Sequence, residues 1–310
     1  MSNISDAATG GPGHGVKPAG GLKALFMRSE PVRGYSLIAP TLIIMIAGIC
    51  VPFAILITMS FWTQTGFEFD TSPTIKNYLN IVDEPVYMVL MTRSLLISGG
   101  CTIVTVALSY PMAYYVAFHV HRHKMVWIIL MTLPFWTSYL LRVFAWKAIL
   151  GYNGIFNSGL KGIGLIDQPL EFLLYSPTAV VITLAHAWAA FAILPMYVSL
   201  EKIDRSLLEA ATDLGDSRLA RFFRVTFPLS LPGVIAAMLI IFIPTVGDYI
   251  TPTLLGGPDG MMIGNMIWAQ FGAVNDWPMG AALAIAMMIT IATFAMVFTL
   301  VTRNLTGRIA

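Results

Sequence analysis

Long apolar runs alternate with short polar segments along the whole of this chain. A helix needs about 20 apolar residues to cross the hydrocarbon layer of a bilayer. Inside lipid the backbone must satisfy its own hydrogen bonds, which a helix does. The pattern therefore predicts six membrane-spanning helices. They cover residues 35–62, 87–118, 125–150, 178–200, 232–250 and 279–302.

Composition supports this interpretation. The chain has 310 residues, of which 57% are hydrophobic and 11% are charged. An average soluble domain is about 45–50% apolar and about 25% charged. We therefore expect an all-α integral membrane protein, with a membrane domain over residues 35–310. Residues 1–34, rich in Gly, Ala, Ser and Pro, are expected to form a disordered cytoplasmic tail.

Charge and cysteine content argue against a nucleic-acid-binding protein and against a disulfide or metal site. A net charge of +2 is too small to indicate a nucleic-acid partner. Cys50 and Cys101 both lie inside apolar runs, so we expect two buried hydrophobic side chains rather than a disulfide or a metal site. No metal site and no resident cofactor is expected.

The positions of Lys and Arg predict the orientation in the membrane. Basic residues concentrate in the tail, in the turn 119–124, in the segment 201–231 and at the C-terminal end. The loops on the opposite side contain only Lys76 and Lys161. Because cytoplasmic loops carry the excess of Lys and Arg, both termini are expected to be cytoplasmic.

Residues 201–231 are too long for a simple connection and carry helix signals. Ser206 and Glu209 have the spacing of a capping box, which predicts a helix beginning at Leu207. Asp216 or Ser217 then has the position to cap a second helix, which Pro228 and Pro232 are expected to end before the fifth span. The segment is predicted to form a helix–turn–helix at the cytoplasmic surface. From periodicity alone, an amphipathic hairpin that only anchors the bundle is equally compatible.

This segment also carries a specific motif. Glu209-Ala210-Ala211, then Gly215, then nine residues and Val225-Thr226-Phe227-Pro228, resembles the EAA signature of ATP-binding-cassette importer permeases, with Val and Phe in place of the usual Ile and Leu. The resemblance implies a type I importer permease fold. It also implies that residues 201–231 form the coupling helix, with Glu209, Ala210, Ala211, Gly215 and Pro228 in contact with a cytoplasmic ATPase.

The resemblance implies a set of partners. They are a second, homologous permease subunit, a homodimeric ATPase, a periplasmic substrate-binding protein and the lipid bilayer of the bacterial inner membrane. The chain contains no Gly-Lys dipeptide and therefore no Walker A phosphate loop. The chain is expected to be a non-catalytic subunit, with ATP and magnesium bound by the partner.

Further motifs narrow the resemblance. The segments 133–138, 142–146, 244–249, 254–258 and 275–278 resemble the spermidine/putrescine permeases, and the putrescine type of first permease subunit more than the spermidine type. This implies transport of polyamines. The wider family also includes permeases for opines, ferric iron, sulfate and phosphonates, which remain alternatives.

Asp248 is the only acidic residue in a predicted span, and ionisable groups inside membranes are commonly functional. A dication such as putrescine favours carboxylates at its ends and aromatic faces along its stem. Tyr249, Trp136, Tyr139 and Arg142 are the further pathway or gate candidates, and we expect Arg142 to pair with Asp248 or to extend outward. The alternatives are an interfacial position for Asp248, and helix packing with an outer aromatic belt for the others.

A stand-alone secondary transporter is the rival from another class. It would need ion-coupling carboxylates within spans or a duplicated half. The sequence has neither feature.

Overall fold

The computed structural model describes residues 30–306. It divides into two units, one ending at Ile55 and one beginning at Leu56. In the first unit lies most of helix α2 (Glu30–Ser60), which contains Pro40 and Pro52. Proline is tolerated inside membrane helices because neighbouring groups satisfy the freed carbonyls. The helix begins at Glu30, within the segment 1–34 that is predicted as a tail, and residues 1–29 lie outside the described residues.

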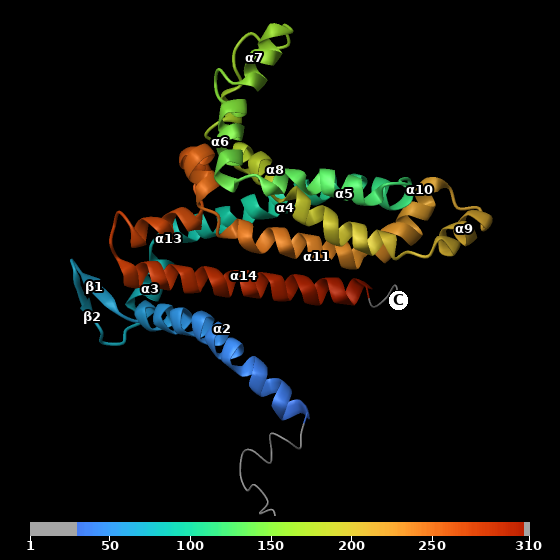
Figure 1. The fold of residues 1–310 in the computed structure, drawn as a ribbon. Helices are drawn as coiled ribbons and strands as arrows, with labels where there is room; N and C mark the ends of the chain where they lie inside the picture. Colours follow the sequence, from blue (N-terminus) through green and yellow to red (C-terminus); the bar gives the residue numbers. More distant parts are fainter. Residues whose placement is uncertain (1–29, 307–310) are drawn as a thin grey trace, which may run out of the picture. The chain divides into compact units, whose positions relative to one another are not determined.

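The second unit is built around three long helices that pack against one another (Figure 1). They are α4 (Pro85–Phe118), α8 (Pro177–Glu201) and α11 (Phe227–Val246). Their facing sides hold the main apolar core, with Cys101, Leu184, Met196 and Ile241 fully or almost fully buried. Helix α14 (Trp277–Thr306) packs against α11 and α13 (Ile263–Phe271).

Five described helices are long and apolar enough to cross a membrane, or six if one bent pair forms a single span. The fold class predicted from the sequence, an all-α membrane protein with about six spans, is confirmed. The structure adds a small antiparallel hairpin of β1 (Thr63–Thr65) and β2 (Glu68–Asp70), in which Gln64 pairs with Phe69. Helix α3 (Lys76–Asp83) follows it.

The third predicted span is the bent pair. Helix α5 (Lys124–Thr132) continues into the 3₁₀ turn η1 (Leu133–Trp136), and α6 (Tyr139–Leu150) starts after a break. The two parts meet at 85°, so residues 125–150 are not the continuous helix that the apolar run predicts. Beyond α6 come α7 (Ile155–Gly162) and the short turn η2 (Glu171–Leu173).

The segment between α8 and α11 forms a helical hairpin, as predicted, with different boundaries. It consists of α9 (Arg205–Asp213), α10 (Arg218–Arg221) and the π-helical stretch η3 (Phe222–Thr226). Asp204, not Ser206, caps α9, because its carboxylate accepts from the backbone N–H of Ser206 at 3.0 Å. Ser217 caps α10 as expected, with its hydroxyl 3.3 Å from the N–H of Ala220.

The expectation that Pro228 and Pro232 end the second helix of the hairpin is wrong. Residues 218–246 form one continuous helical span. In η3 the N–H of Phe227 donates to the carbonyl of Phe222, one residue further back than in an α-helix. This wider turn accommodates the missing donor of Pro228.

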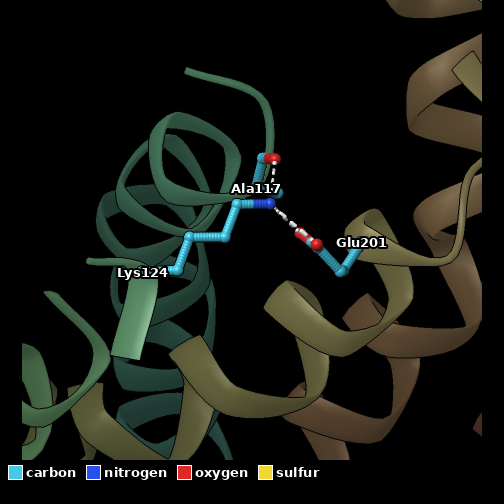
Figure 2. A network of polar contacts seen from close by, with 3 residues as sticks. All are labelled: Ala117, Lys124 and Glu201. Carbon is cyan, nitrogen blue, oxygen red and sulfur yellow. Dashed lines mark hydrogen bonds and ion pairs between the residues drawn. The ribbon is translucent and has the colours of Figure 1, made fainter. Parts of the chain in front are cut away.

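A polar contact joins the ends of three helices near this hairpin (Figure 2). Lys124 Nζ, at the start of α5, lies 2.7 and 2.9 Å from the carboxylate oxygens of Glu201 at the end of α8. It also donates to the carbonyl of Ala117 in α4 at 3.2 Å.

Helix α11 ends at Val246. The chain then continues through η4 (Pro252–Gly256) and α12 (Gly257–Gly260) into α13.

Candidate functional site: a cavity beside Asp248

A cavity of about 540 Å³ lies where α6, α8 and the end of α11 meet. Its walls are mostly aromatic and apolar. The lining residues are Phe135, Thr137, Tyr139, Arg142, Ala187, Trp188, Phe191, Pro244, Gly247, Asp248 and Tyr249. We call it the Asp248 cavity.

Asp248 supplies the acidic group of this cavity. It follows the C-terminal end of α11, and its Oδ1 accepts from the backbone N–H of Ile250 at 3.0 Å. Its Oδ2 accepts from the Tyr139 hydroxyl at 2.5 Å. Because Tyr139 gives its single proton to Asp248, the Thr251 hydroxyl, 2.6 Å away, donates to Tyr139.

Both donors to Asp248 are electrically neutral. Among residues 30–306 the ion pairs are Lys124–Glu201 and Asp216–Arg224, and neither includes Asp248. A carboxylate has about four lone-pair sites, and the described hydrogen bonds occupy two of them. The negative charge and the remaining sites are therefore available to a cationic ligand.

Arg142 does not pair with Asp248, and that expectation is wrong. The guanidinium instead donates to three backbone carbonyls, those of Ala187 at 3.0 Å, Thr137 at 3.0 Å and Phe135 at 3.3 Å. These carbonyls belong to α8 and to the break between η1 and α6. The physical reason is that the break leaves carbonyls without helical partners close to the arginine.

Aromatic rings line the same cavity as the Asp248 carboxylate. Phe135 and Phe191 make an edge contact at 4.5 Å between ring centroids, and Trp188 lies beside Phe191 at 5.2 Å. Tyr249 stacks on Trp268 with centroids 4.9 Å apart and planes 10° apart. Such rings can stabilise a cation through their faces by about 0.5–2 kcal/mol each.

The backbone around Asp248 is held tightly by α13. A Cβ atom added at Gly264 would lie 2.8 Å from the carbonyl oxygen of Gly247 and 2.9 Å from that of Asp248. Asn265 donates to the carbonyl of Tyr249 at 2.9 Å. Larger residues at position 264 would therefore displace the carboxylate.

The α9–α10 hairpin forms a second candidate region. Gly215 has φ of +88°, a conformation that favours glycine, and it makes the turn between the two helices. Arg221 donates to the Thr212 hydroxyl at 2.7 Å, and Arg224 pairs with Asp216 at 2.7 Å. The first contact joins α9 to α10, and the second joins the turn to η3.

The hairpin exposes both charge and apolar surface. Glu209 and Ala210 are exposed, and Leu214 beside the turn is 88% exposed. Ala211 is buried within the chain, so it packs inside the hairpin. Because Asp204 caps α9, Glu209 is left without the capping role that the sequence indicated.

An aromatic cluster links this hairpin to the long helices. The ring of Phe222 in η3 lies 5.9 Å from Tyr110 and 5.9 Å from Tyr114, both in α4. The Tyr110 hydroxyl is 2.8 Å from the Ser230 hydroxyl in α11. The cluster thus connects the hairpin to both α4 and α11.

Comparison with known proteins identifies the family. The profile of the binding-protein-dependent transport system inner membrane component matches residues 33–310. The chain belongs to this family. It is a multi-pass permease and thus a non-catalytic subunit.

Curated relatives agree. The permease is 36% identical to the spermidine/putrescine transport system permease protein PotB of Haemophilus influenzae, over 81% of this chain and 87% of the relative. It is 35% identical to PotB of Escherichia coli, over 83% and 94%. It is also 32% identical to the E. coli inner membrane ABC transporter permease protein YdcU, over 77% and 80%.

Solved structures support the fold. A bacterial alginate ABC transporter, in complex with an alginate pentasaccharide-bound periplasmic protein, matches 92% of this chain and 98% of its own chain with a TM-score of 0.73. Another crystal structure of a bacterial alginate importer gives a TM-score of 0.69 over 93% and 99%. At 17% and 18% identity, these matches establish the type I importer permease fold alone.

The permease brings four of the five predicted pathway residues together, namely Tyr139, Arg142, Asp248 and Tyr249. Trp136 is 83% exposed and does not line the cavity. Phe135 lines it from before the break at residues 137–138, whereas Tyr139 and Arg142 line it from α6 after the break.

Sequence reasoning missed several residues of the site. Trp188 and Phe191 reach the cavity from α8, and Thr251 supports Tyr139. The aromatic pair three residues apart on α8 is a signal that the sequence contained. Thr251 has no such signal, because its role depends on the meeting of α6 with the segment after α11. In the described part of the chain, no cluster of three or more His, Cys, Asp or Glu could hold a metal ion.

Proposed function

We propose that this permease translocates polyamines, putrescine or spermidine, as the membrane subunit of an ATP-driven importer in the bacterial inner membrane. The observation that carries the substrate class is the Asp248 cavity. It combines one carboxylate, whose hydrogen-bond donors among residues 30–306 are neutral, with several aromatic rings. An ammonium group gains a charge-assisted hydrogen bond from Asp248 and cation–π contacts from the rings.

Relatives support the same substrate. The PotB proteins are named for spermidine and putrescine, and they align over most of this chain. Opines, ferric iron, sulfate and phosphonates remain the alternative cargo classes. Sulfate and phosphonate, as anions, would meet the uncompensated charge of Asp248.

Arg142 is compatible with a cation path. Its side chain is buried, and its guanidinium donates to backbone carbonyls. The hydrogen bonds of its Nη atoms go to these carbonyl dipoles and not to Asp248, so the acceptor sites of the carboxylate stay open although the net positive charge of the guanidinium remains. We assign Tyr139 to orienting Asp248, so that the free lone pairs of the carboxylate receive the substrate. Tyr249, stacked on Trp268, is assigned to the wall of the path.

The α9–α10 hairpin is proposed as the coupling element. Glu209, Ala210 and Leu214 are exposed for contact with a homodimeric ATPase, and Gly215 sets the turn. Ala211 and Pro228 act inside the chain, the first by packing the hairpin and the second in its junction with α11. ATP and magnesium bind on the ATPase. The cycle is alternating access, in which closure of the ATPase dimer moves the hairpin and the attached helices.

The remaining partners complete the importer. A second, homologous permease subunit pairs with this chain, and a periplasmic protein delivers the substrate. The fold neighbour crystallised with a substrate-bound periplasmic protein supports the latter kind of partner. Both termini are placed in the cytoplasm by the distribution of Lys and Arg.

The test uses the complete importer. The full-length chain is tagged, purified in detergent with its associated subunits, and reconstituted into liposomes with ATP inside and the periplasmic binding protein outside. Labelled putrescine uptake is expected to require ATP and to be inhibited by excess spermidine, but not by ferric citrate or sulfate.

Two results would contradict different parts of the proposal. Transport by the chain purified free of any ATPase would indicate a secondary transporter. ATP-dependent uptake of sulfate or ferric citrate without polyamine uptake would leave the importer in place and remove the substrate assignment.

A further inference from the structure

The break in the third span leaves backbone groups that a continuous helix would satisfy. Thr137 and Ser138 both have extended ψ angles, of 151° and 134°, between η1 and α6. The carbonyls of Phe135 and Thr137 therefore lie at the end of one helix, where acceptors lack helical donors. Such acceptors, in a protein interior, are costly when unpaired.

Arg142 supplies donors to these carbonyls. It bonds Phe135 and Thr137 on the near side of the break and Ala187 on α8, all within 3.3 Å. The side chain is only 8% exposed. Its planar fork of donors can hold several acceptors in fixed directions, which a lysine cannot do.

The position of Arg142 is unfavourable for a cation in other respects. It lies at the end of the first turn of α6, close to the positive end of the helix dipole. Within the described residues, neither ion pair gives it a carboxylate partner. The three carbonyls are thus the contacts that explain a buried arginine here.

We propose that Arg142 is a positioning residue: it fixes the 85° break against α8 and so holds Tyr139 against Asp248. Tyr139 precedes Arg142 by three residues, which places both on one face of α6. Once the break is fixed, the Tyr139 hydroxyl meets Asp248 Oδ2 and Thr251 Oγ1. The transport part of this inference rests on the proposed function, and the structural part does not.

The structural part is tested by hydrogen–deuterium exchange on the intact importer. We compare Arg142→Gln and Arg142→Lys with the parent and follow amide exchange over residues 135–142. Exchange is expected to rise at least tenfold in the Gln variant and less in the Lys variant, which retains one donor group. Arg93→Gln is the matched control, because Arg93 bonds one carbonyl, that of Pro258 at 2.8 Å, outside the cavity.

The positioning role is tested by a double-mutant cycle on uptake. Arg142→Gln alone is expected to raise the KM for putrescine at most about fivefold, the effect expected for loss of the Tyr139 hydroxyl itself. In a Tyr139→Phe background the same substitution is expected to change KM by less than twofold, because its effect passes through the tyrosine. Arg142→Lys keeps the positive charge and is expected to fall between the Gln variant and the parent.

Three outcomes would overturn the inference. They are unchanged exchange over residues 135–142 in Arg142→Gln, full additivity of the two substitutions, and complete rescue of KM by Arg142→Lys, which would make charge alone the cause. If the parent importer takes up no putrescine, the proposed function fails, while the exchange experiment still decides whether Arg142 holds the break.

Discussion

Two charged clusters of the second unit differ in how their charge is matched. At the C-terminal end of α8, Lys124 contacts both carboxylate oxygens of Glu201 and a carbonyl, so its charge is matched inside the chain (Figure 2). Past the C-terminal end of α11, Asp248 accepts, among residues 30–306, only from a tyrosine hydroxyl and a backbone N–H. The first arrangement is complete without a ligand. The second retains an unmatched charge beside a cavity, which is what binding a cation requires.

Removing the charge of Asp248 is expected to have the largest effect. Asp248→Asn replaces a charge-assisted hydrogen bond to the substrate, worth about 2 kcal/mol, and should raise the KM for putrescine about 30-fold. Initial rates of uptake by the reconstituted importer measure it. Asp167→Asn, an exposed carboxyl outside the cavity, is the control and should leave KM unchanged. Equal KM values for Asp248→Asn and the parent would remove Asp248 from the path.

Tyr139→Phe should have a smaller effect in the same direction. The ring remains, but Asp248 loses the donor that orients its Oδ2. A neutral hydrogen bond contributes about 1 kcal/mol, so KM should rise about fivefold while the maximal velocity stays close to that of the parent. A lower KM would show that the hydroxyl competes with substrate instead of orienting the carboxylate.

Gly215→Ala tests the other end of the bundle. An L-residue in the left-handed conformation costs roughly 1–2 kcal/mol, although the added Cβ meets no atom of this chain within 4 Å. We expect the hairpin turn to change, ATP-driven uptake to fall severalfold in maximal velocity, and KM to stay the same. Gly159→Ala, in α7 with equally open surroundings, is the control. A change in KM alone would contradict the separation of the two ends.

Lys124→Gln should have little effect. Partly exposed ion pairs contribute about 0–1 kcal/mol, and both partners of this pair are partly exposed. Thermal unfolding of the purified importer should shift by a few degrees at most, with KM unchanged. A loss of substrate affinity would show that the matched pair is not merely structural.

The smallest effect concerns Asp204 and pH. The backbone N–H and the side chain of Ser206 hold the pKa of the Asp204 carboxyl below its ordinary value. A carboxyl whose pKa is lowered in the folded state stabilises the fold fully above its unfolded pKa of about 4. That stabilisation is lost as the pH falls through the folded pKa. Above about pH 5 the cap of α9 should therefore be fully formed. Amide exchange in α9, once corrected for its intrinsic dependence on pH, should not change with pH in that range.

The long helices could be predicted because lipid requires long apolar runs. Four of the six predicted spans match the observed helices closely at their ends, as residues 87–118 match Pro85–Phe118. The two failures have local causes. The break after Trp136 is stabilised by Arg142, and the continuous helix through Pro228 depends on the π-helical turn, and neither contact is visible in an apolar pattern.

Part of the site could also be predicted, because some of its residue types are unusual inside membrane spans. Asp248 stands out because acidic residues are rare in spans, and Tyr139 and Tyr249 follow from the search for aromatic surface. The predicted partner of Asp248 was wrong. Opposite charge favoured Arg142 in the sequence, but its guanidinium bonds three backbone carbonyls, two beside the break and one in α8. Trp188 and Phe191 come from another helix, and only packing brings them to the cavity.

Thiol protection in the Asp248 cavity tests the central claim most directly. Phe191→Cys, introduced with Cys50→Ala and Cys101→Ala in the complete importer, places a thiol on the cavity wall. Putrescine under turnover conditions should slow its reaction with a charged thiol reagent at least threefold, and adding Asp248→Asn should abolish this protection. Equal protection with and without the Asp248 carboxylate would contradict the account.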